Sequence, residues 1–169
     1  MNRISTIFLI IAATVFAVFS VPSARAESEA ELIARGRYIA TAIQGCGCHT
    51  REKADGSKDE NWRYAGSPNP APPAGPPANA GWSSPRWKKI YAKNITPDPE
   101  TGIGKWTEAD FMRAMRTGIT PDGRVLDAQM PWYAFQKITD RDLKSLWAYL
   151  KTIKPIKHTP PERIPADTK

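Results

Sequence analysis

The run Cys46-Gly47-Cys48-His49-Thr50 constrains the fold of this chain more than any other stretch, because it contains both cysteines and one of the two histidines. A Cys-x-x-Cys-His run is typical of covalent c-type haem attachment, in which two thiols add to porphyrin vinyl groups and the histidine reaches the iron. Here the spacing is one residue shorter, Cys-x-Cys-His. The run therefore indicates haem only if the rest of the chain agrees with that interpretation.

A reactive dithiol and a zinc site are the competing interpretations of the same residues. A single residue between two cysteines strains disulfide geometry, which leaves a haem-free thiol protein as an open alternative. Zinc usually takes four ligands, and the obvious candidates are Cys46, Cys48, His49 and the distant His158. We expect His158 to be solvated in its charged segment, so zinc is disfavoured.

Residues 1–26 have the pattern of a secretory signal peptide. Arg3 precedes an apolar stretch from Ile4 to Val21, and Ala24-Arg25-Ala26 forms an Ala-x-Ala cleavage site. An uncleaved N-terminal anchor is the alternative. No second apolar stretch of that length follows. We therefore expect export to the periplasm and no membrane span after cleavage.

The charge of the mature chain narrows the class of partner. The full chain has a formal net charge of +7, and loss of Arg3 and Arg25 with the signal peptide leaves +5. This mild positive charge favours acidic partner surfaces. It is too small and too evenly spread to indicate nucleic acid. The 143 residues that remain fit one domain with a modest core.

Three amphipathic segments predict helices. Ser28 with Glu31 forms a capping box, and apolar residues at helical spacing then predict a helix over residues 29–43. Gly36 falls inside this helix, where a glycine suggests close packing against another element or a tolerated surface position. Thr107 is expected to cap a second helix that ends near Gly118.

The last predicted helix begins at Thr139, which has Asp142 three residues later, and it carries the strongest apolar stripe: Leu143, Leu146, Trp147, Leu150 and Ile153. Between the second and last helices, Met130 is followed by Pro131, which disfavours helical backbone at Met130. Met112 and Met115 instead fall on the second predicted helix, where we interpret them as core residues.

Two segments show no helical or strand periodicity. Residues 51–89 contain seven prolines between Pro68 and Pro85, so we expect an irregular surface loop inserted within a domain that spans residues 27–153. Its tryptophans anchor the loop or bind a partner. Residues 154–169 contain four prolines and several charges, and we expect a poorly ordered tail.

Taken together, these residues resemble a single-haem class I c-type cytochrome. The resemblance is strongest from Asn94-Ile95-Thr96-Pro97-Asp98 through Gly102-Ile103-Gly104 to Trp106-Thr107 and Phe111. This stretch is similar to the cytochromes that accept electrons from periplasmic alcohol, gluconate and aldehyde dehydrogenases. The resemblance covers nearly all of the mature chain apart from the proline-rich loop and the tail. Further segments agree with the same group: Arg116-Thr117-Gly118, Asp122-Gly123, Met130-Pro131 and Leu146-Trp147-Ala148-Tyr149-Leu150.

The resemblance implies an all-α fold, a small cytochrome c-like domain with three main helices around one covalent haem c and long irregular loops. It implies that His49 and Met130 are the axial iron ligands and that Cys46 and Cys48 are the attachment residues. Cys48 keeps the family's position relative to His49, so we expect attachment through Cys48 ahead of Cys46. It also implies that the first and last helices cross, which would explain Gly36.

The expected function is electron transfer rather than catalysis. A periplasmic dehydrogenase would be the donor, and an oxidase or another cytochrome the acceptor. A haem enzyme or gas-binding protein remains an alternative that requires an open sixth iron position in place of Met130. A haem-free thiol redox protein using Cys46 and Cys48 is the other.

Overall fold

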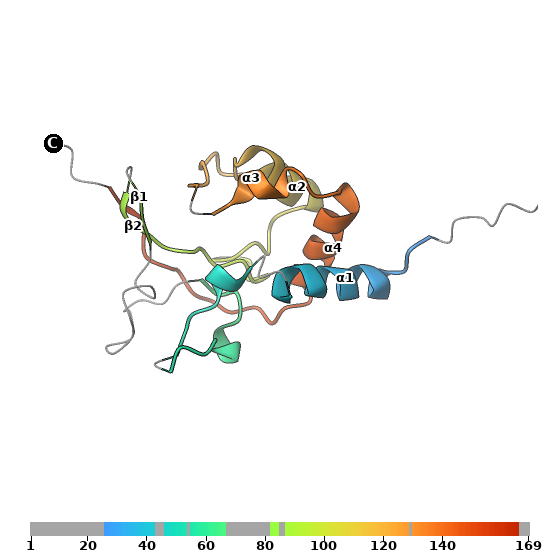
Figure 1. The fold of residues 1–169 in the computed structure, drawn as a ribbon, viewed down its shortest axis with the longest axis horizontal. Helices are drawn as coiled ribbons and strands as arrows, with labels where there is room; N and C mark the ends of the chain where they lie inside the picture. The colour runs from blue at the N-terminus through green and yellow to red at the C-terminus, as the bar shows by residue number, and fades with distance from the viewer. Residues whose placement is uncertain are drawn as a thin grey trace, which may run out of the picture.

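The computed structural model describes residues 26–42, 46–53, 55–66, 82–84, 87–128 and 130–165. The predicted signal peptide lies outside the described residues except for Ala26, as do the centre of the proline-rich loop and the last four residues. Four α-helices, two 3₁₀ turns (Gly47–His49 and Glu60–Trp62) and a small sheet make up the regular structure of the described part. Figure 1 shows the α-helices gathered on one side with the sheet at one end.

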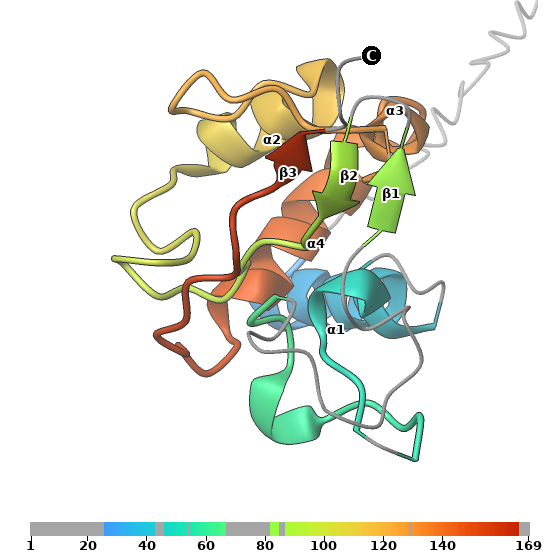
Figure 2. The ribbon, with the colours of Figure 1, turned by 90° about the vertical axis from the view of Figure 1, so that its left-hand side faces the viewer.

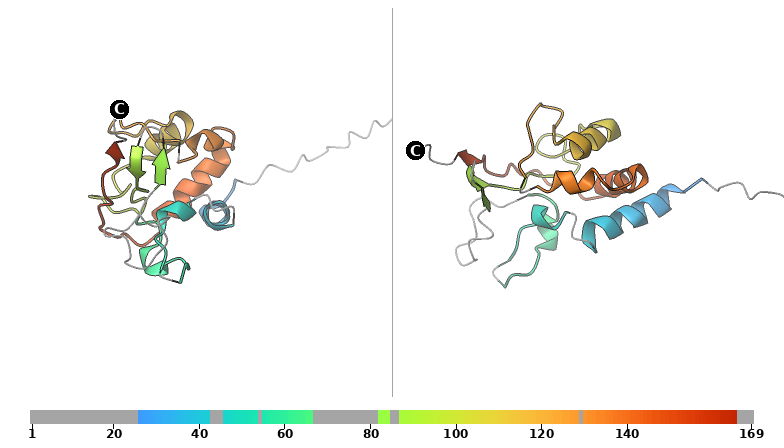
Figure 3. Two further views of the ribbon diagram at one scale, coloured as in Figure 1. Left: turned by 60° about the vertical axis from the view of Figure 1, so that its left-hand side comes forward. Right: turned by 45° about the horizontal axis from the view of Figure 1, so that its top comes forward.

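Helices α1 (Glu29–Thr41) and α4 (Asp140–Lys151) pack across each other, as Figures 1 and 3 show. The predicted capping box of α1 forms, with Ser28 and Glu31 bonding each other's backbone N–H groups. A Cβ atom at Gly36 would overlap the carbonyl oxygen of Ser145 and lie 2.7 Å from Cβ of Tyr149. The close packing expected at Gly36 is therefore confirmed, and α4 is the element that approaches it.

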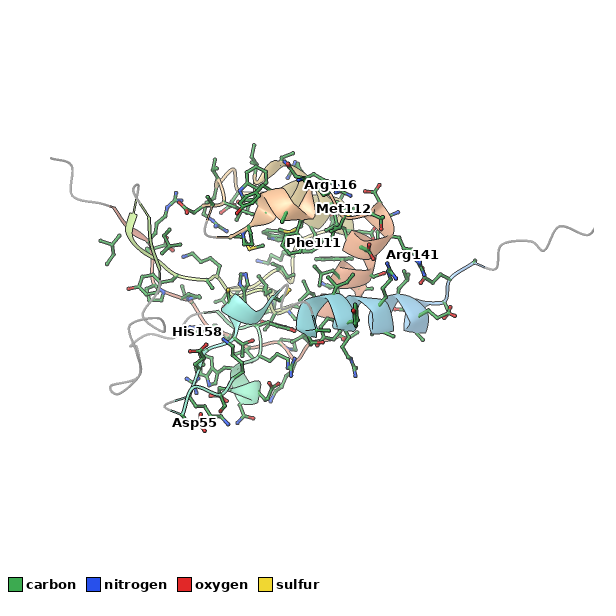
Figure 4. The ribbon with its side chains drawn as sticks, viewed as in Figure 1. Asp55, Phe111, Met112, Arg116, Arg141 and His158 are labelled. Carbon is green, nitrogen blue, oxygen red and sulfur yellow. The ribbon has the colours of Figure 1, made fainter. Side chains whose placement is uncertain are left out.

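Helix α2 (Glu108–Thr117) lies beside α3 (Trp132–Phe135) and α4. Thr107 caps α2 as predicted, and Gly118 ends it in the left-handed conformation at φ +71°. The guanidinium of Arg116 donates to the carbonyls of Phe135 and Gln136, which ties α2 to α3 (Figure 4). Sequence analysis did not predict α3, because a single helical turn is too short to show a period.

The core lies between these helices and confirms the expected all-α fold class. The fully buried Leu143, Leu146 and Leu150 form one face of α4, as the apolar stripe predicted. The buried side chains that pack with them come from α1, α2, α3 and α4 itself and from three positions outside the α-helices: Ile39, Ala40, Phe111, Ala114, Met115, Phe135 and Tyr149, with Cys46, Tyr64 and Ile103. None of the helices in the described part of the chain is long and apolar enough to span a membrane.

A small antiparallel sheet joins two segments in which no strand was expected. Strands β1 (Trp82–Ser84), β2 (Trp87–Ile90) and β3 (Ile164–Pro165) pair in the order β1-β2-β3 (Figure 2). The prediction of an irregular loop over residues 51–89 is therefore wrong where β1 and β2 form. Strands of two to four residues are too short to show alternation, and β3 pairs with a segment far away in sequence.

The prediction of a poorly ordered tail is wrong where the tail bonds to the segment around Asn94 and where Ile164–Pro165 form β3. The side-chain amide of Asn94 donates to the carbonyls of Ile156 and His158, and the N–H of His158 donates to Oγ1 of Thr101. These bonds join side chains to irregular backbone, which leaves no periodic trace in the sequence.

His158 is partly buried and packs against another ring, whereas the sequence interpretation expected it to be solvated. Its ring meets the ring of Trp62 edge to face, with 4.9 Å between the ring centroids. In Figure 4 the label of His158 stands above that of Asp55, which lies in the loop that follows the cysteines. The contact depends on the packing of the tail segment, which brings residue 158 against a tryptophan of the loop that follows the cysteines.

Candidate functional site

A cavity of about 730 Å³ lies among α2, α4, the loops around residues 93–106 and 120–130, and residues 159–162. Small-molecule and cofactor sites typically have volumes of roughly 300–1,000 Å³. Three of the four predicted site residues line this cavity, namely Cys46, His49 and Met130. The fourth, Cys48, is exposed and does not line it.

The cysteine-histidine run forms a 3₁₀ turn, η1 (Gly47–His49), in which the N–H of His49 donates to the carbonyl of Cys46 over 3.0 Å. Side chains three residues apart lie on the same face of such a turn, so Cys46 and His49 point together into the cavity. Cys46 is 5% exposed. The thiols are thus not placed as expected, because Cys46 and not Cys48 faces the cavity.

His49 is oriented by a hydrogen bond from its Nδ1 to the carbonyl oxygen of Lys93, 2.7 Å away. A carbonyl only accepts, so Nδ1 carries the proton and Nε2 keeps a lone pair available to a metal. Burial lowers the pKa of His49, and the charge of Arg124 acts in the same direction, while the bond to Lys93 opposes them. The imidazole is therefore neutral at neutral pH, the state that ligates iron.

Cys46 is held as a thiol. Burial raises its pKa to about 12, and the neighbouring Cys48 acts in the same direction. Thiolate is the form that attacks disulfides and binds zinc, so this environment disfavours both thiol redox chemistry and metal binding by Cys46. Among the described residues, no three His, Cys, Asp or Glu side chains are grouped to hold a metal ion.

Two methionines reach the cavity. Met130 lies in the turn before α3, where its N–H donates to the carbonyl of Asp127 and its own carbonyl accepts from Trp132. Met115 lies on α2, is buried in the core as predicted, and also lines the cavity. Sequence analysis assigned Met115 to the core alone, because helical periodicity does not distinguish a core face from a cavity wall.

The remaining wall suits a flat apolar macrocycle. Apolar side chains from several elements contribute to it: Ile95, Ile103, Phe111, Leu126, Phe135, Leu146 and Leu150. A neutral imidazole and a thioether can ligate haem iron, and a cysteine thiol can attach a c-type haem; all three groups lie at the wall of one largely apolar cavity. We conclude that the residues present fit this cofactor.

Several residues of the cavity could not be found from sequence. Lys93, Arg124 and Glu162 lie on its wall, and Lys93 and Glu162 form an ion pair there at 2.8 Å. These residues belong to irregular segments that meet only in the folded chain. No motif or period in the sequence marks them.

Comparison with known proteins gives relatives but no matching protein-family model. A subunit of the nicotinate dehydrogenase of Pseudomonas putida is 38% identical over 135 residues, or 78% of this chain. The fructose dehydrogenase cytochrome subunit of Gluconobacter japonicus is 38% identical over 73% of the chain. The cytochrome c subunit of the quinone alcohol dehydrogenase of Gluconobacter oxydans is 33% identical over 77%.

The chain is related to the cytochrome c subunits of dehydrogenases. This relationship confirms the resemblance seen in the residues from Asn94 to Phe111 and beyond. The chain spans a fraction of each of these longer proteins, namely 9% of the nicotinate dehydrogenase subunit, 22% of the fructose dehydrogenase subunit and 23% of the alcohol dehydrogenase subunit.

Proposed function

We propose that the protein is a periplasmic electron-transfer cytochrome c that carries one covalently bound haem, accepts electrons from a dehydrogenase and passes them to an oxidase or another cytochrome. The observation that carries the proposal is that Cys46, His49 and Met130 line one largely apolar cavity. The names of the relatives support a dehydrogenase partner. The signal-peptide pattern of residues 1–26 supports the location.

Haem c, when bound, supplies the one-electron Fe(III)/Fe(II) chemistry. His49 would ligate the iron through Nε2, and the carbonyl of Lys93 would keep the imidazole in that orientation. Met130 would provide the second protein ligand to the iron, and a thioether favours ferrous iron and so raises the reduction potential. The apolar side chains that α2 and α4 contribute to the cavity wall would shield a bound haem from water.

Replacing Met130 with Ala tests the ligand assignment, and Met115→Ala is the matched control because Met115 lines the same cavity. Both variants would be expressed with haem-maturation machinery. We expect Met130→Ala to abolish the long-wavelength methionine-to-iron absorption band of the ferric protein and to lower the potential. Met115→Ala should keep the band.

Three outcomes would contradict this assignment. The band could be absent from the wild type, it could survive Met130→Ala, or it could disappear in Met115→Ala alone, which would make Met115 the ligand. Binding of carbon monoxide by the ferrous wild type would instead favour the haem enzyme or gas-binding protein, since both need an open sixth position.

A further inference from the structure

The two thiols of the cysteine-histidine run lie on different sides of η1. Cys46 is 5% exposed and lines the cavity with His49, whereas Cys48 is exposed and outside it. A 3₁₀ turn advances about 120° per residue, so thiols three positions apart share one face, whereas Cys46 and Cys48, two positions apart, are directed roughly 120° away from each other. The shortened spacing thus separates the thiols that the usual spacing would direct to one cofactor.

We propose that the haem is held by a single thioether bond, formed by Cys46, and that Cys48 remains a free surface thiol. This inference rests on the proposed function, since it assumes that the cavity holds a haem. It reverses the order in which the sequence alone ranks the two cysteines.

The bond requires no additional reactant. The S–H of Cys46 adds across one vinyl group, so that Sγ bonds to the carbon next to the porphyrin ring and the hydrogen completes a methyl group on the terminal carbon. The addition is redox-neutral, so it needs neither an oxidant nor a reductant. Cys46 and His49 share one face of η1, so a single orientation of the turn serves both the thioether and the iron ligand.

Cys48 can reach the cavity only if η1 rotates or unwinds, and contacts on both sides of the turn oppose that movement. Two hydrogen bonds close the turn: the N–H of His49 donates to the carbonyl of Cys46, and the N–H of Thr50 donates to the carbonyl of Gly47 over 3.2 Å. From outside, the N–H of Gly66 donates to the carbonyl of His49 over 2.7 Å. Rotation would also break the bond between His49 and Lys93 that orients the imidazole.

The flanking residue Thr50 is fixed in the same way. It is 6% exposed, and its Oγ1 accepts the N–H of Tyr64 over 3.0 Å. Residues 64–66 therefore hold the end of the run from outside, and this bonding favours the observed orientation of η1 over one that turns Cys48 inward.

The experiment counts thiols in the wild-type holoprotein, expressed as the full chain with haem-maturation machinery. Denaturation, alkylation with iodoacetamide and intact-mass measurement should give one haem and one alkylated thiol per chain. Peptide mapping should place the haem on Cys46, and alkylation before denaturation should already modify Cys48. Two matched variants complete the design: Cys48→Ser should keep covalent haem and an unchanged reduced pyridine-haemochrome band, whereas Cys46→Ser should lose covalent haem.

The outcomes separate the two proposals. Covalent haem with no alkylatable thiol would show two thioether bonds. Haem mapped to Cys48, or lost in Cys48→Ser, would show that Cys48 is the attachment residue. Each of these results overturns this inference and leaves the proposed function standing. Haem that is bound but extracts fully into acidified solvent overturns this inference as well. A wild type without haem overturns the proposed function itself. If Cys46→Ser fails to fold or mature, the thiol count of the wild type still decides.

Discussion

We expect Gly36→Ala to destabilise the protein although alanine is the better helix former. In an exposed helix interior the exchange would stabilise by about 1 kcal/mol. At this position the new Cβ would overlap the carbonyl oxygen of Ser145 and lie 2.5 Å from its carbonyl carbon. These are backbone atoms of α4, so no side-chain rotation relieves the overlap and the two helices must separate.

The magnitude follows from these opposing effects. Overpacking of a filled core costs roughly 1–3 kcal/mol, and a clash against backbone belongs at the upper end of that range. After subtraction of the helix-propensity gain, we expect a net loss of about 2 kcal/mol in the free energy of unfolding. Urea titration of the holoprotein, followed by circular dichroism, measures this loss as a lower midpoint at unchanged slope.

Ala34→Gly provides the matched control, because Ala34 is exposed on the same helix and the exchange is the reverse one. It should lose about 1 kcal/mol through propensity alone. The reasoning is refuted if Gly36→Ala is as stable as the wild type or more stable, since the approach of α4 would then impose no cost.

Two further predictions concern charge. The hydrogen bond from Arg35 lowers the pKa of Asp142 and links α1 to α4. The pKa of Asp142 is therefore lower in the folded than in the unfolded chain. The stabilisation that this bond contributes is complete above the ordinary carboxyl pKa of about 4 and is lost as the pH falls through the folded pKa. The difference in unfolding free energy between wild type and Asp142→Asn, at most about 1 kcal/mol for a partly exposed pair at the surface, should therefore shrink in acid. A difference independent of pH would contradict this. Electron transfer from a dehydrogenase partner should slow as ionic strength rises, because the net charge of +5 expected after signal-peptide cleavage favours an acidic partner surface. An association-limited rate that does not depend on salt would count against that partner.

The helices could be predicted from sequence because their signals are local. Ser28, Thr107 and Thr139 each cap a helix through the backbone N–H three residues on, and such a spacing is visible without a fold. Gly118 ends α2 at positive φ, where a Cβ would also lie 2.6 Å from the indole of Trp132. A local rule therefore located this helix end, and a tertiary contact reinforces it.

The segments that were predicted wrongly depend on distant partners. Strand β3 exists because Ile164 pairs with Lys89, and the tail is fixed because its carbonyls accept from Asn94. A two-residue strand is too short to leave a pattern in the sequence, and a backbone carbonyl that accepts a hydrogen bond leaves none. Both therefore look like an irregular segment. Proline content indicated the absence of periodic structure, but that absence says nothing about whether a segment packs.

The candidate site shows the same division between local and distant information. Residue type identifies His49 and Met130 as possible ligands, because few side chains offer nitrogen or sulfur to iron. The group that fixes the imidazole is the backbone carbonyl of Lys93, 44 positions away, and any residue at that position would supply it. The side on which each thiol lies depends likewise on the hydrogen bonds that close and anchor η1, and these involve backbone atoms of His49 and Gly66. The side chains that give the site its chemistry can therefore be identified from the sequence. The main-chain groups that orient these side chains come together only in the folded chain.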